Sequence, residues 1–224
     1  MPAGGTGLVL RGLRKEPAAI GKWHLGWDWT HKEGKAKTVD NIGFTKRVAN
    51  GPTDRGFDYF YGLTSPSGPP HLYMVNDMAE KQPNTRFEES GGGLYKIKGG
   101  IGHSDWSADG MQPHLADKML EYLDENKDSD KPFFLYMALT APHIPLFPSK
   151  EFKGKSKIGD YGDLVMMIDD IVGRVNRKLK EIGKYDNTIV MFAADNGCAG
   201  YINMDRINRK GHYPSYIYRG YKSH

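Results

Sequence analysis

The sequence contains only one cysteine, Cys198, among its 224 residues, which excludes a disulfide framework within the chain. No apolar run approaches the roughly 20 residues of a membrane-spanning helix, and the amino-terminal residues lack the charged-then-apolar layout of a signal peptide. The formal net charge is +4, and Lys and Arg are scattered among acids, without the basic stripe typical of nucleic-acid binding. We therefore expect neither a nucleic-acid nor a membrane partner, and the compartment stays unassigned.

The most informative stretch comprises residues 186–197. Thr188 to Ala194 is a continuous apolar run, too short for a helix, which predicts a strand buried on both faces. Asp195 and Asn196 follow it directly, and ligands of α/β sheets bind beyond the carboxyl ends of strands. A carboxylate beside an amide oxygen suits Ca²⁺ or Mg²⁺. The alternative is a turn that needs no metal, because Asp-Asn-Gly is also a strong hairpin signal.

A second apolar run, Phe133–Leu139, predicts another buried strand. It leads into residues 140–145, whose two prolines hold His143 in a rigid extended loop. Between the two predicted strands, apolar residues repeat at helical spacing from Tyr161 to Ile182. The three segments predict a right-handed βαβ unit, whose parallel strands place His143 and Asp195 at the same edge of the sheet.

Towards the amino terminus, a short strand is expected to end near Gly21. In an extended segment Lys22 and His24 share one face, while Trp23 and Leu25 anchor the other. A cation and an imidazole at a strand exit indicate an anion site. The alternative is a surface loop whose Trp packs on the core.

The rest of the chain contributes one more helix and a long irregular region. The helix is expected from about Met111 to Asn126, with Asp109 as its cap. Residues 27–106 are punctuated by Gly, Pro and aromatic residues and are expected to form functional loops over a site.

Together these motifs resemble the sulfatase family of the alkaline phosphatase superfamily. Five segments follow the family's order, and a set of five is specific where each alone is weak. These segments are Gly21–Gly26, Arg55–Gly62, Ala141–Pro145, Asp195–Gly197 and Arg219–Lys222. The resemblance covers almost the whole chain. It implies an α/β fold with a mostly parallel, alkaline-phosphatase-like sheet flanked by helices.

The resemblance also implies an arylsulfatase-like function, hydrolysis of the sulfuric ester of an aryl or sugar alcohol. It implies that Lys22 and His24 bind the sulfate and assist departure of the alcohol. His143 and Lys222 are implied to hold sulfate oxygens. Such cations would stabilise the charge that develops on those oxygens during the reaction.

The resemblance further implies that Asp195 and Asn196 ligate a divalent cation, usually Ca²⁺. With only these two ligands we expect weak Ca²⁺ binding or none. Family members also use a formylglycine made from a Cys-x-Pro-x-Arg motif, and two aspartates of the first strand. Neither precedes Lys22 here, and Cys198 is followed by Ala-Gly.

We therefore expect residues 1–224 to be an internal part of a sulfatase catalytic domain. It would be incomplete on its amino-terminal side, without the carboxy-terminal subdomain, and inactive alone. Two alternatives remain open. One is a phosphate or phosphonate monoester hydrolase of the same superfamily, and the other is a non-catalytic anion-binding protein.

Overall fold

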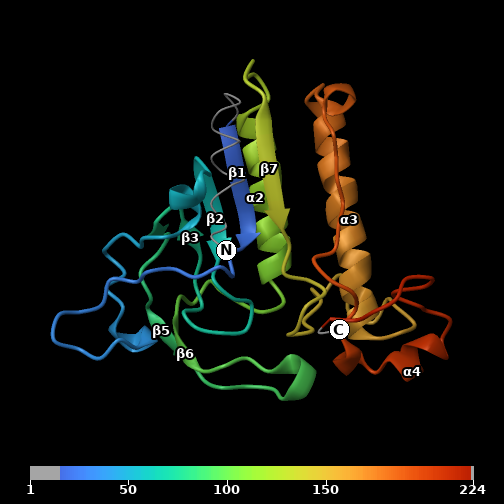
Figure 1. Cartoon of the computed structure of the whole chain (residues 1–224), viewed down its shortest axis with the longest axis horizontal. Coiled ribbons are helices and arrows are strands. Elements are labelled where there is room, and N and C mark those ends of the chain that lie inside the picture. Colours follow the sequence, from blue (N-terminus) through green and yellow to red (C-terminus); the bar gives the residue numbers. More distant parts are fainter. Residues whose placement is uncertain (1–15, 223–224) are drawn as a thin grey trace.

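The computed structural model describes residues 16–222 and contains a mixed five-stranded sheet with helices (Figure 1). The strand order is β4-β3-β2-β1-β7. The central β1 pairs in parallel with β2 and β7, while β2–β3 and β3–β4 are antiparallel. A separate antiparallel pair is formed by β5 and β6. The strands are β1 Glu16–Lys22, β2 Tyr59–Leu63, β3 Met74–Val75, β4 Met78–Ala79, β5 Thr85–Phe87, β6 Gly100–Gly102 and β7 Phe133–Ala138.

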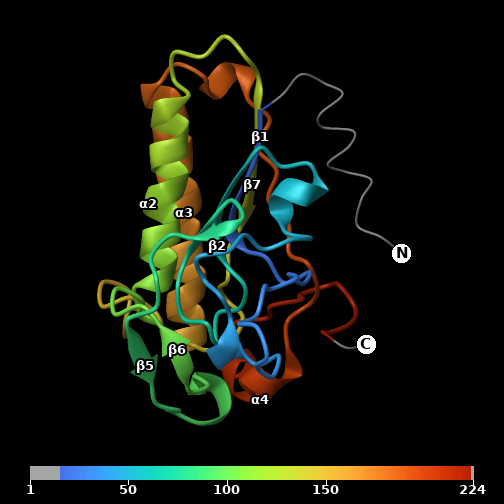
Figure 2. The ribbon, with the colours of Figure 1, turned by 90° about the vertical axis from the view of Figure 1, so that its left-hand side faces the viewer.

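Two long helices, α2 (Met111–Glu125) and α3 (Asp160–Glu181), cover one face of this sheet (Figure 2). A short helix, α4 (Met204–Asn208), lies near the carboxyl end. None of the helices in the described range has the length and apolar character to cross a membrane. Short 3₁₀ helices occupy Val39–Asn41, Pro52–Arg55, Gly93–Tyr95, Tyr185–Asn187 and Gly200–Ile202. The expected α/β class and both long helices are confirmed.

Hydrophobic clusters lie on both faces of the sheet because the central strand presents alternate residues to opposite faces. Ala18 and Ile20 of β1 contribute to the larger cluster, beneath the helices. Ala19 points to the other face, where a smaller cluster includes Trp23 and Phe60. Loops rather than long helices cover that second face (Figure 2).

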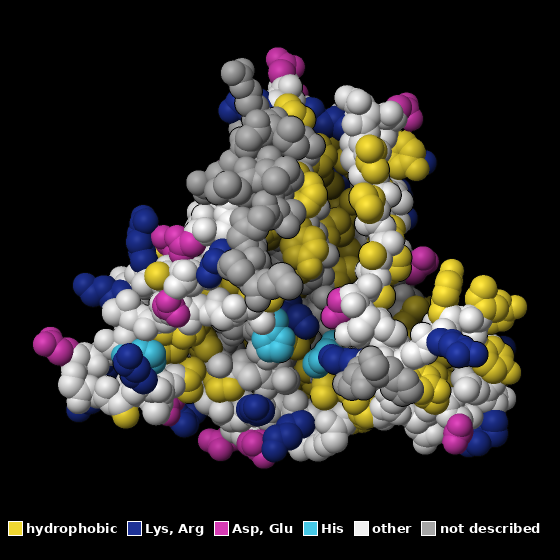
Figure 3. Space-filling view, in the orientation of Figure 1, with side chains coloured by type: hydrophobic (Ala, Val, Ile, Leu, Met, Phe, Trp, Pro, Cys, Tyr) yellow, Lys and Arg dark blue, Asp and Glu magenta, His cyan; other side chains and the backbone are white. Residues whose placement is uncertain are grey.

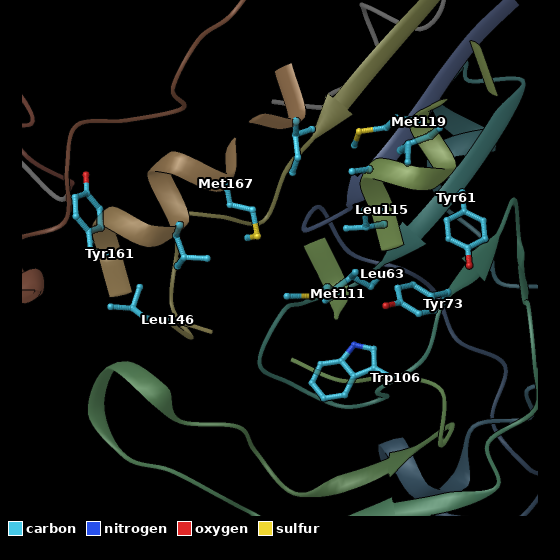
Figure 4. Packing of buried hydrophobic residues seen from close by; sticks show 14 of the residues in the cluster. Tyr61, Leu63, Tyr73, Trp106, Met111, Leu115, Met119, Leu146, Tyr161 and Met167 are labelled. Carbon is cyan, nitrogen blue, oxygen red and sulfur yellow. The ribbon is translucent and has the colours of Figure 1, made fainter. Parts of the chain in front are cut away.

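Helix α2 fits the larger cluster because its apolar residues recur every four positions. Met111, Leu115 and Met119 are each at most 3% exposed. They lie towards Tyr61 and Leu63 of β2 (Figure 4). Each such side chain stabilises the fold by about 1.5–3 kcal/mol relative to exposure. The expected Asp109 cap is wrong, since the N-cap is Gly110 and no side chain caps the helix.

The apolar repeat from Tyr161 to Ile182 predicted helix α3, and the buried face of the helix also includes apolar residues outside that repeat. Leu164, Met167 and Ile171 are buried, whereas Val165 is only partly so. Asp163, an acid in the first turn of this helix, is fully buried. Its carboxylate accepts backbone hydrogen bonds from Gly154 (2.8 Å) and Ser156 (2.6 Å), so it fixes the loop before the helix. A buried carboxylate needs such partners.

The irregular region contains a strand that the sequence analysis missed. β2 pairs with β1 residue by residue from Tyr59 to Leu63. Gly62 concealed it, because glycine is rare in strand interiors. A Cβ at Gly62 would lie 1.8 Å from the carbonyl oxygen of Gly21, so close strand approach explains the glycine.

The predicted strand Thr188–Ala194 is wrong. The segment forms no strand, and Ile189, Met191 and Phe192 are 89%, 89% and 72% exposed. In Figure 1 it descends along α3, apart from β7. Hydrophobic surface is visible between the strands and this segment (Figure 3). β7 and α3 therefore do not continue into a third sheet element, and the predicted βαβ unit is not completed.

Candidate active site

Lys22 is the last residue of the central strand β1, so it lies at the carboxyl end of that strand. Gly21, which precedes it, has a φ of +131°, and a Cβ there would lie 2.0 Å from the carbonyl oxygen of Ala138 in β7. Only glycine tolerates this approach, so the close β1–β7 contact explains the Gly-Lys pair. Lys22 itself is partly buried.

The next residues form a turn anchored by Trp23. Its indole N–H donates to the carbonyl oxygen of Gly26 at 3.1 Å, and its ring is 6% exposed. The expected anchoring role of Trp23 is confirmed. The same expectation for Leu25 is wrong, because that side chain is 66% exposed. His24 is also exposed, at the surface of the turn.

His143 lies in the loop that follows β7, and its tautomer is defined by a neighbouring carbonyl. Nδ1 is 2.6 Å from the carbonyl oxygen of Ile144. A carbonyl only accepts, so Nδ1 carries the hydrogen. The Nε2 atom of the neutral ring is therefore the one without a proton, and it is available to another group. The two prolines that flank His143 both follow cis peptide bonds.

Residues 195–198 and 220–222 lie against each other. The backbone N–H of Lys222 donates to the carbonyl oxygen of Cys198 at 3.1 Å. A Cβ on Gly197 would lie 2.9 Å from the carbonyl oxygen of Gly220, so this approach also requires glycine. Asp195 is exposed beside this contact. The contact brings Lys222 next to the segment that carries Asp195.

Electrostatic interactions connect these distant parts of the sequence. Burial lowers the pKa of Lys22; Asp195 opposes this effect and Lys222 adds to it. Burial likewise lowers the pKa of His143. The hydrogen bond to Ile144 opposes that shift.

Three further cations lower the pKa of His143. They are Lys222, Lys22 and His24. Like charges this close disfavour one another's protonated forms. Histidine, basic and acidic side chains gather on this face in Figure 3. The structure thus brings four basic groups and one acid into one cluster, which we call the cation cluster: Lys22, His24, His143, Lys222 and Asp195.

The predicted metal ligands fit a cation only incompletely. Within residues 16–222, no group of three or more His, Cys, Asp or Glu side chains is arranged to hold a metal ion. The amide nitrogen of Asn196 donates to the carbonyl oxygen of Gly197 at 2.9 Å, which leaves its oxygen free. Ca²⁺ takes six to eight oxygens, and Asp195 with Asn196 supplies too few of them.

Two other features lie outside the cation cluster. An open cavity of about 520 Å³ is lined by Phe87, Trp106, Phe147 and other residues, none of them from the cluster. Cys198 is half-buried, its thiol is 3.5 Å from the hydroxyl of Tyr161, and burial raises the pKa of the thiol. A thiol held protonated is a poor nucleophile.

Comparison with known proteins now defines the class. Residues 9–219 match the Sulfatase family. The chain is 31% identical over 195 residues to N-acetylgalactosamine-6-sulfatase of Sus scrofa, covering 85% of this chain and 32% of the relative. It is 27% identical over 238 residues to N-acetylgalactosamine-6-O-sulfatase of Bacteroides thetaiotaomicron, covering 91% of this chain and 45% of the relative.

Solved structures agree with this assignment. A Bacteroides thetaiotaomicron protein, from a structure titled for metabolism of multiple glycosaminoglycans, has a TM-score of 0.73 at 25% identity. That match covers 96% of this chain and 50% of the other. The fold is that of the alkaline-phosphatase-like α/β proteins. The chain belongs to the sulfatase family, as its motifs indicated, and it spans between about a third and half of the length of these relatives.

The charged groups of the cluster were readable from the sequence, whereas the backbone features that position them were not. The signals were glycines whose role could be read only in part. Gly21 precedes Lys22, Gly197 follows Asn196, and Gly220 lies two residues before Lys222. Gly21 and Gly197 stand where another backbone approaches closely, and Gly220 has a φ of +95°, which favours glycine. A sequence does not reveal the approaching segment.

Proposed function

We propose that this chain binds the sulfate group of a sulfated sugar through its cation cluster, as part of sulfuric ester hydrolysis. One observation carries the proposal: four basic groups from three distant segments interact at one end of the sheet. A sulfate ester presents an anionic group with several acceptor oxygens, and clustered cationic donors bind such a group well. The relatives named N-acetylgalactosamine-6-sulfatase support a sugar as the alcohol portion.

The roles within the cluster follow from its geometry and chemistry. Protonated His143 keeps its Nδ1 hydrogen on Ile144 and donates from Nε2 to a sulfate oxygen. Lys22 and Lys222 supply ammonium groups to other oxygens. We assign to His24, which is exposed on its turn, the donation of a proton to the departing alcohol. Charge on the sulfate oxygens is stabilised by groups that are already oriented.

We infer that binding, and not turnover, is what residues 16–222 achieve by themselves. Sulfate ester hydrolysis needs a nucleophile activated by a base or by a lowered pKa. Burial raises the pKa of the Cys198 thiol, and the hydrogen bonds to Tyr161 and Ala199 offset only part of that shift, so the thiol does not meet this requirement. The cluster can position and polarise an ester but does not supply the attacking group.

We further propose that the chain binds Ca²⁺ weakly, if at all. Asp195 and Asn196 offer few of the oxygens that the ion requires. Isothermal titration calorimetry of Ca²⁺ into chelator-treated protein tests this. A stoichiometric site of micromolar or tighter affinity would contradict it and would mean that other carboxylates contribute.

Titration with sugar sulfates tests the main proposal. N-acetylgalactosamine 6-sulfate should bind, inorganic sulfate should compete, and unsulfated N-acetylgalactosamine should not bind. Lys22→Ala and Lys222→Ala should each weaken binding by roughly tenfold, the value of one charge-assisted hydrogen bond. Lys157→Ala, which changes an equal charge on a lysine outside the cluster, is the control.

Hydrolysis is assayed in parallel, and the outcomes separate the alternatives. Binding without product release supports the proposal. Tighter binding of inorganic phosphate and a phosphate ester than of their sulfate counterparts would favour the phosphate-ester alternative. Release of sulfate by the chain alone, abolished by His143→Ala, would show that the inferred lack of a nucleophile is wrong.

A further inference from the structure

The loop that carries His143 begins at a buried residue, Thr140. Its side chain and backbone are 3% exposed, and it follows β7 within two residues. The backbone N–H of His143 donates to the carbonyl oxygen of Thr140 at 3.2 Å. The position of Thr140 therefore sets the start of the turn on which the imidazole sits.

Thr140 is in turn held by Gln112, the second residue of α2. The side-chain oxygen of Gln112 accepts from the backbone N–H of Thr140 at 3.0 Å and from its hydroxyl at 2.7 Å. Both Thr140 groups are donors in this arrangement, so the amide oxygen of Gln112 must face them. The two hydrogen bonds tie the loop to the first turn of a buried helix.

This link is retained at a cost. Gln112 is 3% exposed, and its amide nitrogen is buried without a hydrogen-bond partner in the described structure. A buried donor without a partner is unfavourable. Its neighbours Met111, Leu115 and Ala116 are apolar, so an apolar side chain would suit core packing better at this position. The two hydrogen bonds to Thr140 account for a glutamine at position 112.

We propose that Gln112 is a positioning residue of the anion site: through Thr140 it fixes the turn that presents Nε2 of His143 to the sulfate group. This inference rests on the function proposed above. Gln112 does not touch the anion. It acts by holding the loop in the observed arrangement, in which Nδ1 of His143 reaches the carbonyl oxygen of Ile144.

Four variants separate positioning from general stability. Gln112→Met keeps the side-chain size and removes the acceptor, while Thr140→Val removes only the hydroxyl donor. Thr140→Ser keeps both donors and should restore wild-type behaviour. The matched control is Gln82→Met, which removes a single side-chain hydrogen bond, from Gln82 to the carbonyl oxygen of Phe44 at 3.0 Å, in another part of the chain.

Three measurements are made on each variant of the full chain. Nitrogen-15 spectra of the imidazoles report the tautomer of His143, assigned with a His143→Gln sample. Calorimetric titration with inorganic sulfate reports affinity. Melting temperature is recorded to identify general loss of stability, and Thr140→Val decides the matter if Gln112→Met does not fold.

The proposal expects wild-type protein and Thr140→Ser to show the Nδ1–H tautomer. Gln112→Met should show a mixture of tautomers and bind sulfate roughly three- to tenfold more weakly than wild type. The sulfate affinity of Thr140→Val should lie between those of wild type and Gln112→Met. Gln82→Met should melt earlier and leave His143 and sulfate affinity unchanged. An unchanged tautomer in both Gln112→Met and Thr140→Val would overturn the proposal.

The failure of the two proposals can be told apart. If wild-type protein binds no sulfate, the proposed function fails, yet the tautomer of His143 still shows whether Gln112 positions the ring. If wild-type protein binds sulfate and Gln112→Met binds it equally with an unchanged tautomer, only the positioning role is wrong.

Discussion

Two apolar segments of similar composition adopt different structures in this protein. Phe133–Ala138 forms β7, whereas Thr188–Ala194 forms no strand and exposes its large side chains. Both are short, both contain aromatic residues, and each precedes a residue of the cation cluster. Apolar composition therefore does not by itself make a strand.

The two segments differ in whether the backbone pairs with a neighbouring strand. β7 pairs with β1 at six successive positions, from Phe133 opposite Glu16 to Ala138 opposite Gly21. It also packs on the core beneath α2 and α3 through Leu135 and Met137. The segment after α3 descends apart from β7, which is one of the two edge strands of the described sheet (Figure 1). A strand is stabilised by pairing and by side-chain packing together.

The largest expected difference comes from placing a charge in each segment. Leu135→Asp puts a carboxylate at a partly buried position of β7 that packs against the core, and it should destabilise the fold by about 2 kcal/mol or more. Phe192→Asp, at a 72% exposed position, should change the free energy of unfolding by no more than about 0.5 kcal/mol. Urea denaturation followed by circular dichroism measures both. Equal destabilisation would mean that Phe192 is packed in solution.

Glycine replacement contrasts the same two regions. Gly21→Ala places a Cβ 2.0 Å from the oxygen of Ala138 and should cost about 2–3 kcal/mol, because two sheet backbones must separate. Gly197→Ala meets the oxygen of Gly220 at 2.9 Å, and we expect about 1 kcal/mol. Urea denaturation measures the stability of both variants, and calorimetric titration measures their affinity for sulfate.

For Gly197→Ala, the loss of sulfate affinity and the loss of stability should differ in size. Gly197→Ala should weaken sulfate binding more than its small effect on stability suggests, since it displaces Lys222. Gly183→Ala serves as a control: its φ is +68°, and a Cβ there meets nothing within 4 Å. Loss of sulfate affinity in that control would argue against a local effect at Gly197.

The pH dependence of sulfate binding tests the loop after β7. The pKa of His143 is lowered in the free protein, and a bound sulfate raises it. Affinity should be highest below the free pKa, fall as pH rises between the free and bound values, and level off above both. We expect a change of roughly tenfold, equivalent to one pKa unit. Calorimetry across this range measures it, and His143→Gln should remove the dependence.

The smallest effect is expected at Asp195, which directly follows the segment Thr188–Ala194. Asp195 is exposed and its charge opposes an anion near Lys22, so Asp195→Asn should strengthen sulfate binding by roughly two- to fivefold in chelator-treated protein. Glu181→Gln, an acid at the far end of α3, controls for net charge. Weaker binding in Asp195→Asn would indicate that this carboxylate organises the site.

Much of the fold was readable from the sequence because its signals are local. The periodicity that predicted a helix from about Met111 to Asn126 matches α2, and the run that predicted Phe133–Leu139 matches β7 to within one residue. β2 was not predicted because Gly62 interrupts its pattern, and that glycine reflects contact with Gly21 of β1, which lies 41 residues earlier in the chain. Asp163 escaped because its partners are backbone groups of a loop.

For the candidate site, the sequence by itself determined the residue types and the family: two lysines and two histidines in sulfatase-like motifs. Tertiary structure alone decided that these groups interact and which nitrogen of His143 is free. It also decided that Thr188–Ala194 stays outside the sheet. Local pattern governs helices and isolated motifs through neighbours in the chain. Strand pairing, buried hydrogen bonds and charge interactions depend on partners that the fold brings from elsewhere.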